Sequence, residues 1–405
     1  MRIVGFERGE NMQRSLGAEE VGVVNPNVWL SLRSAFYAFA LSRILCMLAA
    51  LLASAISTQW PAPQNDGETL RLITEDSAAL LRTRVLANDA GWYLGIASEG
   101  YEKRPFDVSR QANWAFFPLH PWLWRVLIRL GIAPWLSGLV LANTMFLLAL
   151  IQLHRWVCSL RGQNVADRAV LCVALFPTSY FFSLPWSESL FLLLSVSSFL
   201  ALRSQRWWLA AVFGAFASAT RLTGILIAPV IWFEAKAHLG ARSVKLWMAT
   251  ALVFLGLAAF MIVLWSDTGN ALAFADIQQA WGRNGGSLTK WLYRWVSDPL
   301  LVAEFWNLRW INNGSFVLLL AASLWLWRRR FLGFSAFTAL CALLPFGSGT
   351  LLSMGRYVLT CAPVFLALAC WLEHPRVCLA WLIISSCLLV FMCSAFVLGA
   401  TFAGA

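Results

Sequence analysis

The run WLSLRSAFYAFALSRILCMLAALLASAIS, residues 29–57, decides the fold of this chain. It is predominantly apolar and longer than the roughly 20 residues that an α-helix needs to cross a bilayer. Further apolar runs follow it through to the C-terminal region, and together they predict an all-α polytopic membrane protein with about 11 transmembrane helices. These further runs cover residues 135–157, 169–185, 188–202, 207–219, 222–234, 246–265, 311–327, 331–346, 355–372 and 377–399.

The composition supports the same class of protein. Hydrophobic residues make up 60% of the chain and charged residues 13%, whereas a soluble domain is about half apolar and a quarter charged. The net charge of +11 does not indicate a nucleic-acid partner, because the arginines lie between apolar runs and are better explained by membrane topology.

Cysteine and histidine spacing gives no sign of a metal site or of a cofactor. The nine cysteines are scattered, contain no CxxC pair, and are interpreted as small hydrophobic residues. The four histidines lie too far apart to form a metal-ligand motif. We therefore expect no metal and no cofactor.

The distribution of Lys and Arg predicts the orientation of the chain. Residues 1–28 are charged, contain no apolar segment typical of a signal peptide, and are expected to form a cytosolic tail. Residues 29–405 would form the transmembrane domain. With a cytosolic N-terminus, every short basic loop falls on the cytosolic side, and the C-terminus faces outward. The residues of these loops are Arg161 and Arg168, Arg203 and Arg206, Lys236, Arg242 and Lys245, Arg328 to Arg330, and Arg376.

Two long loops, about 58–134 and 266–310, face the outer side in this topology. They are rich in Trp, Gly and Pro and contain amphipathic pieces, so we expect interfacial helices on the membrane surface. The pair 207–219 and 222–234 is ambiguous, because it is either two half-length helices or one long span. Three consecutive arginines, 328–330, favour two helices, since a single span would place them outside.

Five ionisable residues that are distant in sequence fall at the outer face in this topology. Ionisable groups at membrane depth are costly and are therefore candidates for function. The five are Asp89, Glu188, Arg221, Arg283 and Arg356.

Each of these residues also has a structural interpretation. Asp89, or the neighbouring Asn88, could cap a helix, and Glu188 could interact with the dipole of the helix that it begins. Arg221 and Arg356 could extend to the interface. The predicted location of all five residues at the outer membrane face favours an anionic, lipid-linked substrate. The arginines would bind its phosphate, and a carboxylate would accept a proton.

Several segments resemble one family in the same order along the chain. NDAGWYLGIASEGY (88–101) followed by ANWAFFPLHPWLWR (112–125) is similar to the first-loop signature of the GPI mannosyltransferase 2 (PIG-V-like) family. Four later segments extend the resemblance over about residues 86–365. They are FPTSYFFSLPWSESLFLLLS (176–195), ATRLTGILIA (219–228), GNALAFADIQQAWGR (269–283) and GRYVLTCAPVF (355–365). One position departs from the family pattern: Asn88 stands where a Trp is usual.

The resemblance implies a GT-C glycosyltransferase, a multi-span enzyme that takes a sugar from a polyprenyl-phosphate donor on the non-cytosolic face. The expected donor is polyprenyl-phosphate-mannose, and the expected acceptor is a lipid- or glycan-linked molecule (a glycan or glycolipid). The second loop resembles bacterial members, which implies a bacterial inner-membrane enzyme whose site faces the periplasm.

The expected reaction inverts the configuration at the anomeric carbon and uses one carboxylate. A lipid phosphate leaves as an anion, so it does not need the acid that glycoside hydrolysis requires. Asp89 would be the base, while Arg221, Arg356 and Arg283 would bind the donor phosphate. Further residues would bind or orient the substrates. These residues are Glu188, Trp92, Tyr93, Tyr101, His120 and Tyr357.

A transporter or flippase of an anionic lipid or sugar phosphate is the alternative from another class. It would use the same arginines but would need a polar path to the cytosolic face. The cytosolic halves of the apolar runs offer few polar residues, so we favour the transferase over a transporter or a lipid-binding scaffold.

Overall fold

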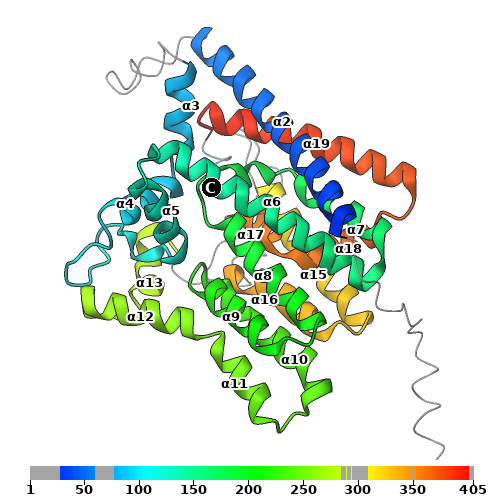
Figure 1. The fold of residues 1–405 in the computed structure, drawn as a ribbon. Coiled ribbons are helices and arrows are strands. Elements are labelled where there is room, and N and C mark those ends of the chain that lie inside the picture. The colour runs from blue at the N-terminus through cyan, green and yellow to red at the C-terminus, as the bar shows by residue number, and fades with distance from the viewer. Residues whose placement is uncertain are drawn as a thin grey trace, which may run out of the picture.

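The computed structural model describes residues 28–59, 77–283, 309–347 and 353–400, with isolated positions 289, 293 and 351. Helices are the only regular secondary structure in these residues (Figure 1). The expected cytosolic tail therefore lies outside the described residues apart from Val28, as does much of the second predicted loop. The protein is an all-α, multi-pass membrane protein.

Most of the predicted apolar runs form one helix each. Four described helices are long and apolar enough to cross a membrane, or up to six if two bent pairs each count as one span. The predicted number of about 11 spans stays a prediction. The helices that match single runs are α2 (Val28–Gln59), α6 (Pro134–Arg161), α8 (Glu188–Arg203), α9 (Trp207–Ser218), α10 (Ile227–Leu239), α15 (Arg309–Arg328), α16 (Leu332–Gly347) and α19 (Pro375–Val397).

Two predicted runs are bent helix pairs. α11 (Val244–Leu252) and α12 (Leu255–Thr268) meet at 45°, and α17 (Met354–Thr360) and α18 (Ala362–Trp371) meet at 80°. In the second pair Pro363 lies in the first turn of α18. A proline cannot continue a preceding helix without losing a backbone hydrogen bond, so α17 ends just before it.

The predicted helix over residues 169–185 is wrong. α7 (Gln163–Ala174) ends early, and a short 3₁₀ helix, η2 (Ser179–Ser183), follows it. Pro177 and Pro185 flank η2, and each removes a backbone donor that a continuous helix would need. The chain therefore reaches the start of α8 through a non-helical segment.

The ambiguous pair at 207–234 is two helices, as the triple arginine favoured. α9 ends at Ser218, and the 3₁₀ helix η3 (Leu222–Leu226) leads into α10. Gly224 makes this break possible, because a Cβ there would lie 2.2 Å from the carbonyl carbon of Ala217. η3 thus packs directly on the backbone of α9.

Both predicted outer loops contain short helices. The first loop has α3 (Ser77–Val85), α4 (Asp89–Ser98), η1 (Asn113–Ala115) and α5 (Leu119–Arg129), and the second has α13 (Ala273–Asp276) and η4 (Ile277–Trp281). α4, α5 and α13 gather on one side of the molecule beside α12 (Figure 1). Their position relative to a membrane stays a prediction.

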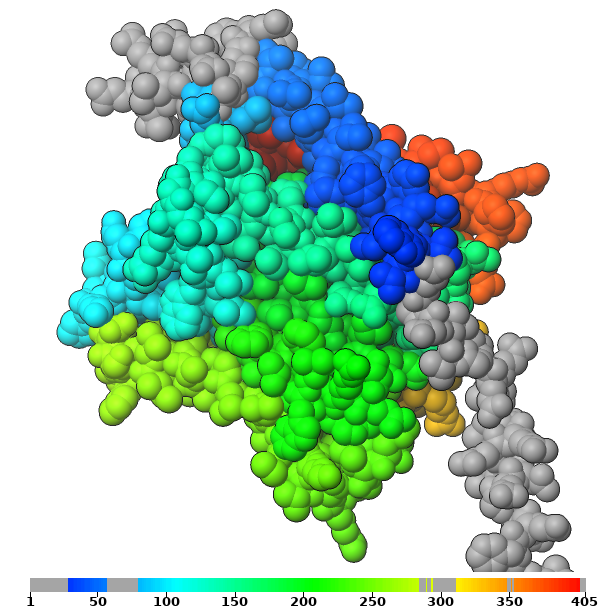
Figure 2. Space-filling view, viewed as in Figure 1, coloured from blue at the N-terminus to red at the C-terminus, as the bar shows by residue number. Residues whose placement is uncertain are grey.

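The remaining helices pack around α6 and α8. Interlocked aromatic rings tie the bundle together, with Trp156 of α6 5.4 Å from Phe199 of α8 and 5.1 Å from Phe334 of α16 between ring centroids. α2 packs along α19 at the edge of the bundle (Figure 2). Exposed side chains on this pair, such as Tyr37 and Ile384, are apolar or aromatic, as a lipid-facing surface requires.

Candidate active site

Four ionisable side chains from distant parts of the chain form one compact ion cluster: Asp89, Glu188, Arg221 and Arg356. A single oxygen of Glu188, Oε1, accepts hydrogen bonds from Nη1 of Arg221 at 2.5 Å and from Nε of Arg356 at 2.7 Å. Nη2 of Arg356 lies 2.6 Å from the same oxygen and 2.6 Å from Oδ2 of Asp89. Arg356 therefore bridges the two carboxylates.

Helix ends bring these four groups together. Asp89 is the first residue of α4 and Glu188 the first residue of α8, where a negative charge is favoured by the helix dipole. Arg221 lies in the extended break between α9 and η3, and Arg356 lies in the first turn of α17. The interrupted helices thus point polar side chains into an otherwise apolar bundle.

The helix-cap interpretation of Asp89 does not hold. Asn88 occupies the cap position with φ 55° and makes no side-chain capping hydrogen bond. Asp89 is already inside the helix, and its carboxylate faces Arg356. A structural cap therefore does not explain why an acid is present at this position.

Exposure distinguishes the two acids of the ion cluster. The Glu188 side chain is fully buried, whereas 26% of the Asp89 side chain is exposed. Arg221 and Arg356 are 15% and 10% exposed. With two carboxylates and two guanidiniums the cluster is formally neutral, and Asp89 is the acid that an incoming molecule can reach.

Aromatic rings support both arginines. The guanidinium carbon of Arg356 lies 4.4 Å from the ring centroid of Trp186 and 5.6 Å from that of Phe181. The guanidinium carbon of Arg221 lies 5.7 Å from the Tyr357 ring. These are cation–π distances, and they place Tyr357 beside the ion cluster.

Tyr93 and His120 lie against the same cluster. The Tyr93 hydroxyl donates to Oγ of Ser187 at 2.9 Å, and the Tyr93 ring meets the His120 ring at 5.1 Å. Burial, with a smaller contribution from Glu188, raises the pKa of Tyr93, so its phenol stays protonated. Burial lowers the pKa of His120 to about 4. Nε2 of the neutral ring then donates to the carbonyl oxygen of Pro185, 3.0 Å away. The protonated Tyr93 phenol therefore cannot accept a proton near neutral pH.

The remaining predicted residues line a neighbouring aromatic wall. Trp92 stacks on Phe116 at 5.8 Å and meets the edge of Trp281 at 5.9 Å, which joins the two outer loops. The Tyr101 hydroxyl donates to the carbonyl oxygen of Phe116 at 2.7 Å.

Arg283 follows the aromatic wall, and its Nη1 donates to Oε1 of Gln278 at 2.8 Å. The structure shows no contact from Arg283 or Tyr101 to the ion cluster within the described residues.

Three residues near the site were missed from the sequence. Ser187 and Trp186 contact the ion cluster, but nothing in their local pattern separates them from other residues of an apolar loop. Arg43 could have been found, because an arginine inside the first apolar run is unusual. Over the described ranges, the structure brings no three His, Cys, Asp or Glu side chains together as metal ligands.

The fold and the site define a multi-pass membrane protein with a partly exposed carboxylate and two guanidiniums at interrupted helices. The chain belongs to the mannosyltransferase (PIG-V) family, whose model matches residues 33–279. The match includes Asp89, Glu188 and Arg221, while Arg356 lies beyond it.

Similar solved structures come from the oligosaccharyltransferase of Archaeoglobus fulgidus. The apo form has 14% identity and a TM-score of 0.45, covering 86% of this chain and 56% of that one. The complex with an inhibitory peptide and a dolichol-phosphate has 13% identity and a TM-score of 0.43, with the same coverage. The present chain thus spans about half the length of these structures. No curated protein sequence matches it.

Proposed function

We propose that this protein is an inverting mannosyltransferase. It would move mannose from a polyprenyl-phosphate-mannose to a lipid- or glycan-linked acceptor on the outer (periplasmic or lumenal) face of the membrane. The observation that carries the proposal is the ion cluster, in which one accessible carboxylate lies beside two guanidiniums. Family membership supports the sugar, and the chemistry of the cluster supports an anionic donor.

The two guanidiniums suit the phosphate of the donor. Glu188 holds both of them through one oxygen, which fixes their orientation before substrate arrives. Nη1 of Arg356 and Nη2 of Arg221 make no hydrogen bond to another described residue. These N–H groups are therefore available to phosphate oxygens, for which a guanidinium has matching geometry.

The observed Asp89–Arg356 ion pair requires an exchange of partners before the reaction. While Oδ2 of Asp89 contacts Nη2 of Arg356, that oxygen is not free to accept a proton. We infer that the donor phosphate takes over Nη2 of Arg356 and releases Asp89. The base would then be free only when the donor is in place.

The released Asp89 would accept the proton of the acceptor hydroxyl. The hydroxyl oxygen forms a bond to the anomeric carbon from the face opposite the phosphate, and the bond between that carbon and the phosphate oxygen breaks. The leaving phosphate keeps the electron pair, and Arg221 and Arg356 stabilise its charge. This series of steps inverts the configuration at the anomeric carbon and needs a single carboxylate.

The aromatic wall supplies the remaining recognition. Trp92 and Tyr101 would offer apolar faces to the sugar and the prenyl chain. Tyr93, His120 and Tyr357 would orient the groups around the phosphate. Arg283 would reach the donor from the second loop.

The test uses purified protein, polyprenyl-phosphate-mannose and a range of acceptors. Asp89→Asn preserves the size of the side chain and removes its basicity. Transfer should fall about 10²–10⁴-fold, the usual contribution of a general base, while the variant should bind the donor more tightly than the wild type. Transfer at the wild-type rate by this variant would contradict the mechanism. Absence of transfer by the wild type with every acceptor would contradict the proposed function.

A further inference from the structure

Arg43 forms a second arginine site, which is half-buried in the first apolar helix and separate from the ion cluster. From α2, its Nη1 donates to Oγ of Ser183 at 2.5 Å, and its Nη2 lies 3.1 Å from both the carbonyl oxygen and Oγ of Ser179. Its guanidinium carbon lies 4.9 Å from the Phe146 ring centroid. No carboxylate of a described residue forms an ion pair with it.

A guanidinium inside a membrane helix without a carboxylate partner is expensive to keep. A single neutral donor would satisfy the one carbonyl group that Arg43 contacts. The planar guanidinium does more, because its two Nη groups reach Ser179 and Ser183, the first and last residues of η2. This is a geometry that an ammonium or an amide does not reproduce. Arg43 therefore clamps the whole of η2 to α2.

η2 also contacts the ion cluster. Phe181, between the two serines, stacks on Trp186 with ring centroids 4.8 Å apart. Arg356 lies over both of these rings. Arg43 and Arg356 thus both contact η2, which precedes Glu188 by a few residues.

The clamp also satisfies a backbone carbonyl group in a segment that lacks the hydrogen bonds of a continuous α-helix. η2 lies in a non-helical stretch between α7 and α8, and such backbone is tolerated within a membrane protein only where other groups satisfy it. Ser189 contributes by donating to the carbonyl oxygen of Phe182 at 3.1 Å. Arg43 is the charged contributor among these described contacts.

We propose that Arg43 is a positioning residue for the donor-phosphate site. It holds η2 so that Phe181 and Trp186 form the platform on which Arg356 rests between Glu188 and Asp89. The inference rests on the proposed function, because it is through Arg356 that Arg43 would affect donor binding.

A double-mutant cycle tests this coupling. The binding of polyprenyl-phosphate-mannose is measured for the wild type, Arg43→Met, Arg356→Lys and the double variant in detergent or nanodiscs. Arg43→Met should weaken binding about five- to tenfold in the wild-type background, the usual scale of coupling between residues of one network. In the Arg356→Lys background it should have almost no further effect.

Arg84→Met is the matched control. Arg84 also donates to a backbone carbonyl, that of Val397 at 2.9 Å, but it contacts the end of α19 and not η2. Its loss should leave donor affinity unchanged in both backgrounds, even if Tm falls. Arg43→Lys, which reaches one serine at a time, should restore part of the affinity lost in Arg43→Met.

A second variant covers the case in which Arg43→Met does not fold. The Ser179→Ala, Ser183→Ala double variant keeps the arginine but removes two acceptors of its clamp, and it should weaken donor binding in the same Arg356-dependent way. Additive losses in either cycle, or equal losses in Arg84→Met, would overturn the positioning role while the proposed function stands. A wild-type protein that is folded but binds no donor would overturn both.

Discussion

At the scale of single residues, the proposed mechanism makes Asp89 and the donor phosphate compete for one guanidinium. The 2.6 Å contact between Arg356 and Asp89 would have to open when the phosphate binds, so the carboxylate would oppose donor binding as well as serve catalysis. This double role would separate Asp89 from a residue that only carries out proton transfer.

Replacing Asp89 by Asn should therefore tighten donor binding while transfer falls. A hydrogen bond to a charged group is worth about 1 kcal/mol more than a neutral one, which predicts an affinity gain of about fivefold. Equilibrium binding of polyprenyl-phosphate-mannose to both proteins measures the change. An unchanged or weaker affinity in Asp89→Asn would argue against the exchange of partners.

Replacing Arg356 by Lys tests the phosphate assignment at the other partner. The charge stays, but the planar fork that contacts Glu188 through Nε and Nη2 is lost. Donor affinity should fall by about 1.5–3 kcal/mol, or roughly 10- to 150-fold.

Arg155→Lys is a matched control for this change, because Arg155 bonds Gln152 on α6 and lies outside the ion cluster. Equal donor affinities of Arg356→Lys and wild type would indicate that Arg356 has a purely structural role.

At the scale of elements, breaks in helices place the ion cluster. Arg221 depends on the tight turn after α9, where Gly224 packs on the backbone of Ala217. The backbone atoms around this contact cannot move aside as a flexible side chain could. The position of η3, and of the guanidinium before it, thus follows from the absence of a side chain at residue 224.

Gly224→Ala should displace η3 and weaken donor binding. A Cβ at 2.2 Å from Ala217 forces a backbone shift, and overpacking of this kind typically costs about 1–3 kcal/mol. Thermal unfolding and donor binding should both be impaired. Gly314→Ala is the control, because a Cβ there meets no atom within 4 Å and should be neutral or slightly stabilising. Wild-type behaviour of Gly224→Ala would show that the turn is not a constraint on Arg221.

The same breaks mark the limit of prediction from sequence. Length and apolarity identify α2, α6 and α19 to within about four residues at each end, because a spanning helix is defined by its composition. They do not reveal that residues 169–185 leave the helical conformation, since hydropathy does not register the hydrogen bonds that Pro177 and Pro185 remove. The two prolines could have indicated this break, but a count of apolar residues does not take them into account.

The four residues of the ion cluster could be predicted from the sequence, but the ion pairs between them could not. The predicted topology places Arg283 at the same face as these four residues, but within the described residues the structure joins only the four by ion pairs. Which carboxylate faces which guanidinium depends on packing between α4, α8 and α17, over more than 250 residues of sequence separation. The pairing of Arg356 with both acids therefore needed the structure.

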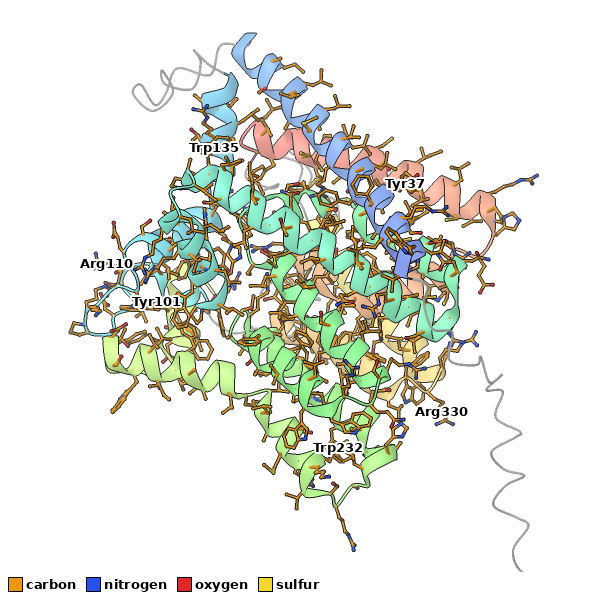
Figure 3. The ribbon with its side chains drawn as sticks, viewed as in Figure 1. Tyr37, Tyr101, Arg110, Trp135, Trp232 and Arg330 are labelled. Atoms are coloured by element: carbon orange, nitrogen blue, oxygen red, sulfur yellow. The ribbon has the colours of Figure 1, made fainter. Side chains whose placement is uncertain are left out.

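At the scale of the whole molecule, the first predicted outer loop and the triple-arginine turn lie on different sides. Arg110, in the first predicted outer loop, and Arg330, in the triple-arginine turn, are at opposite sides of the view in Figure 3. Positive residues favour the cytosolic side of a membrane, so the side carrying Arg330 is expected to be cytosolic. The ion cluster, beside the short helices of the outer loops, would then face away from the cytosol.

Labelling of single cysteines tests this orientation in intact cells. Asp107 and Arg329 are both exposed, so each can carry a reactive thiol without disturbing the core. With the cytosolic N-terminus that the basic loops predict, Asp107→Cys should react with a membrane-impermeant maleimide in intact cells. Arg329→Cys should react only after the membrane is permeabilised.

The background for this experiment should lack Cys387, the one native thiol of the nine that is exposed. Labelling of Arg329→Cys but not Asp107→Cys in intact cells would invert the topology and place the ion cluster on the cytosolic side. The donor would then have to be presented there, and the assignment of an outer-face transferase would be wrong even if Asp89 and Arg356 act as proposed. Labelling of both positions in intact cells would mean that they share one face, which contradicts the number of crossings predicted between residues 134 and 328.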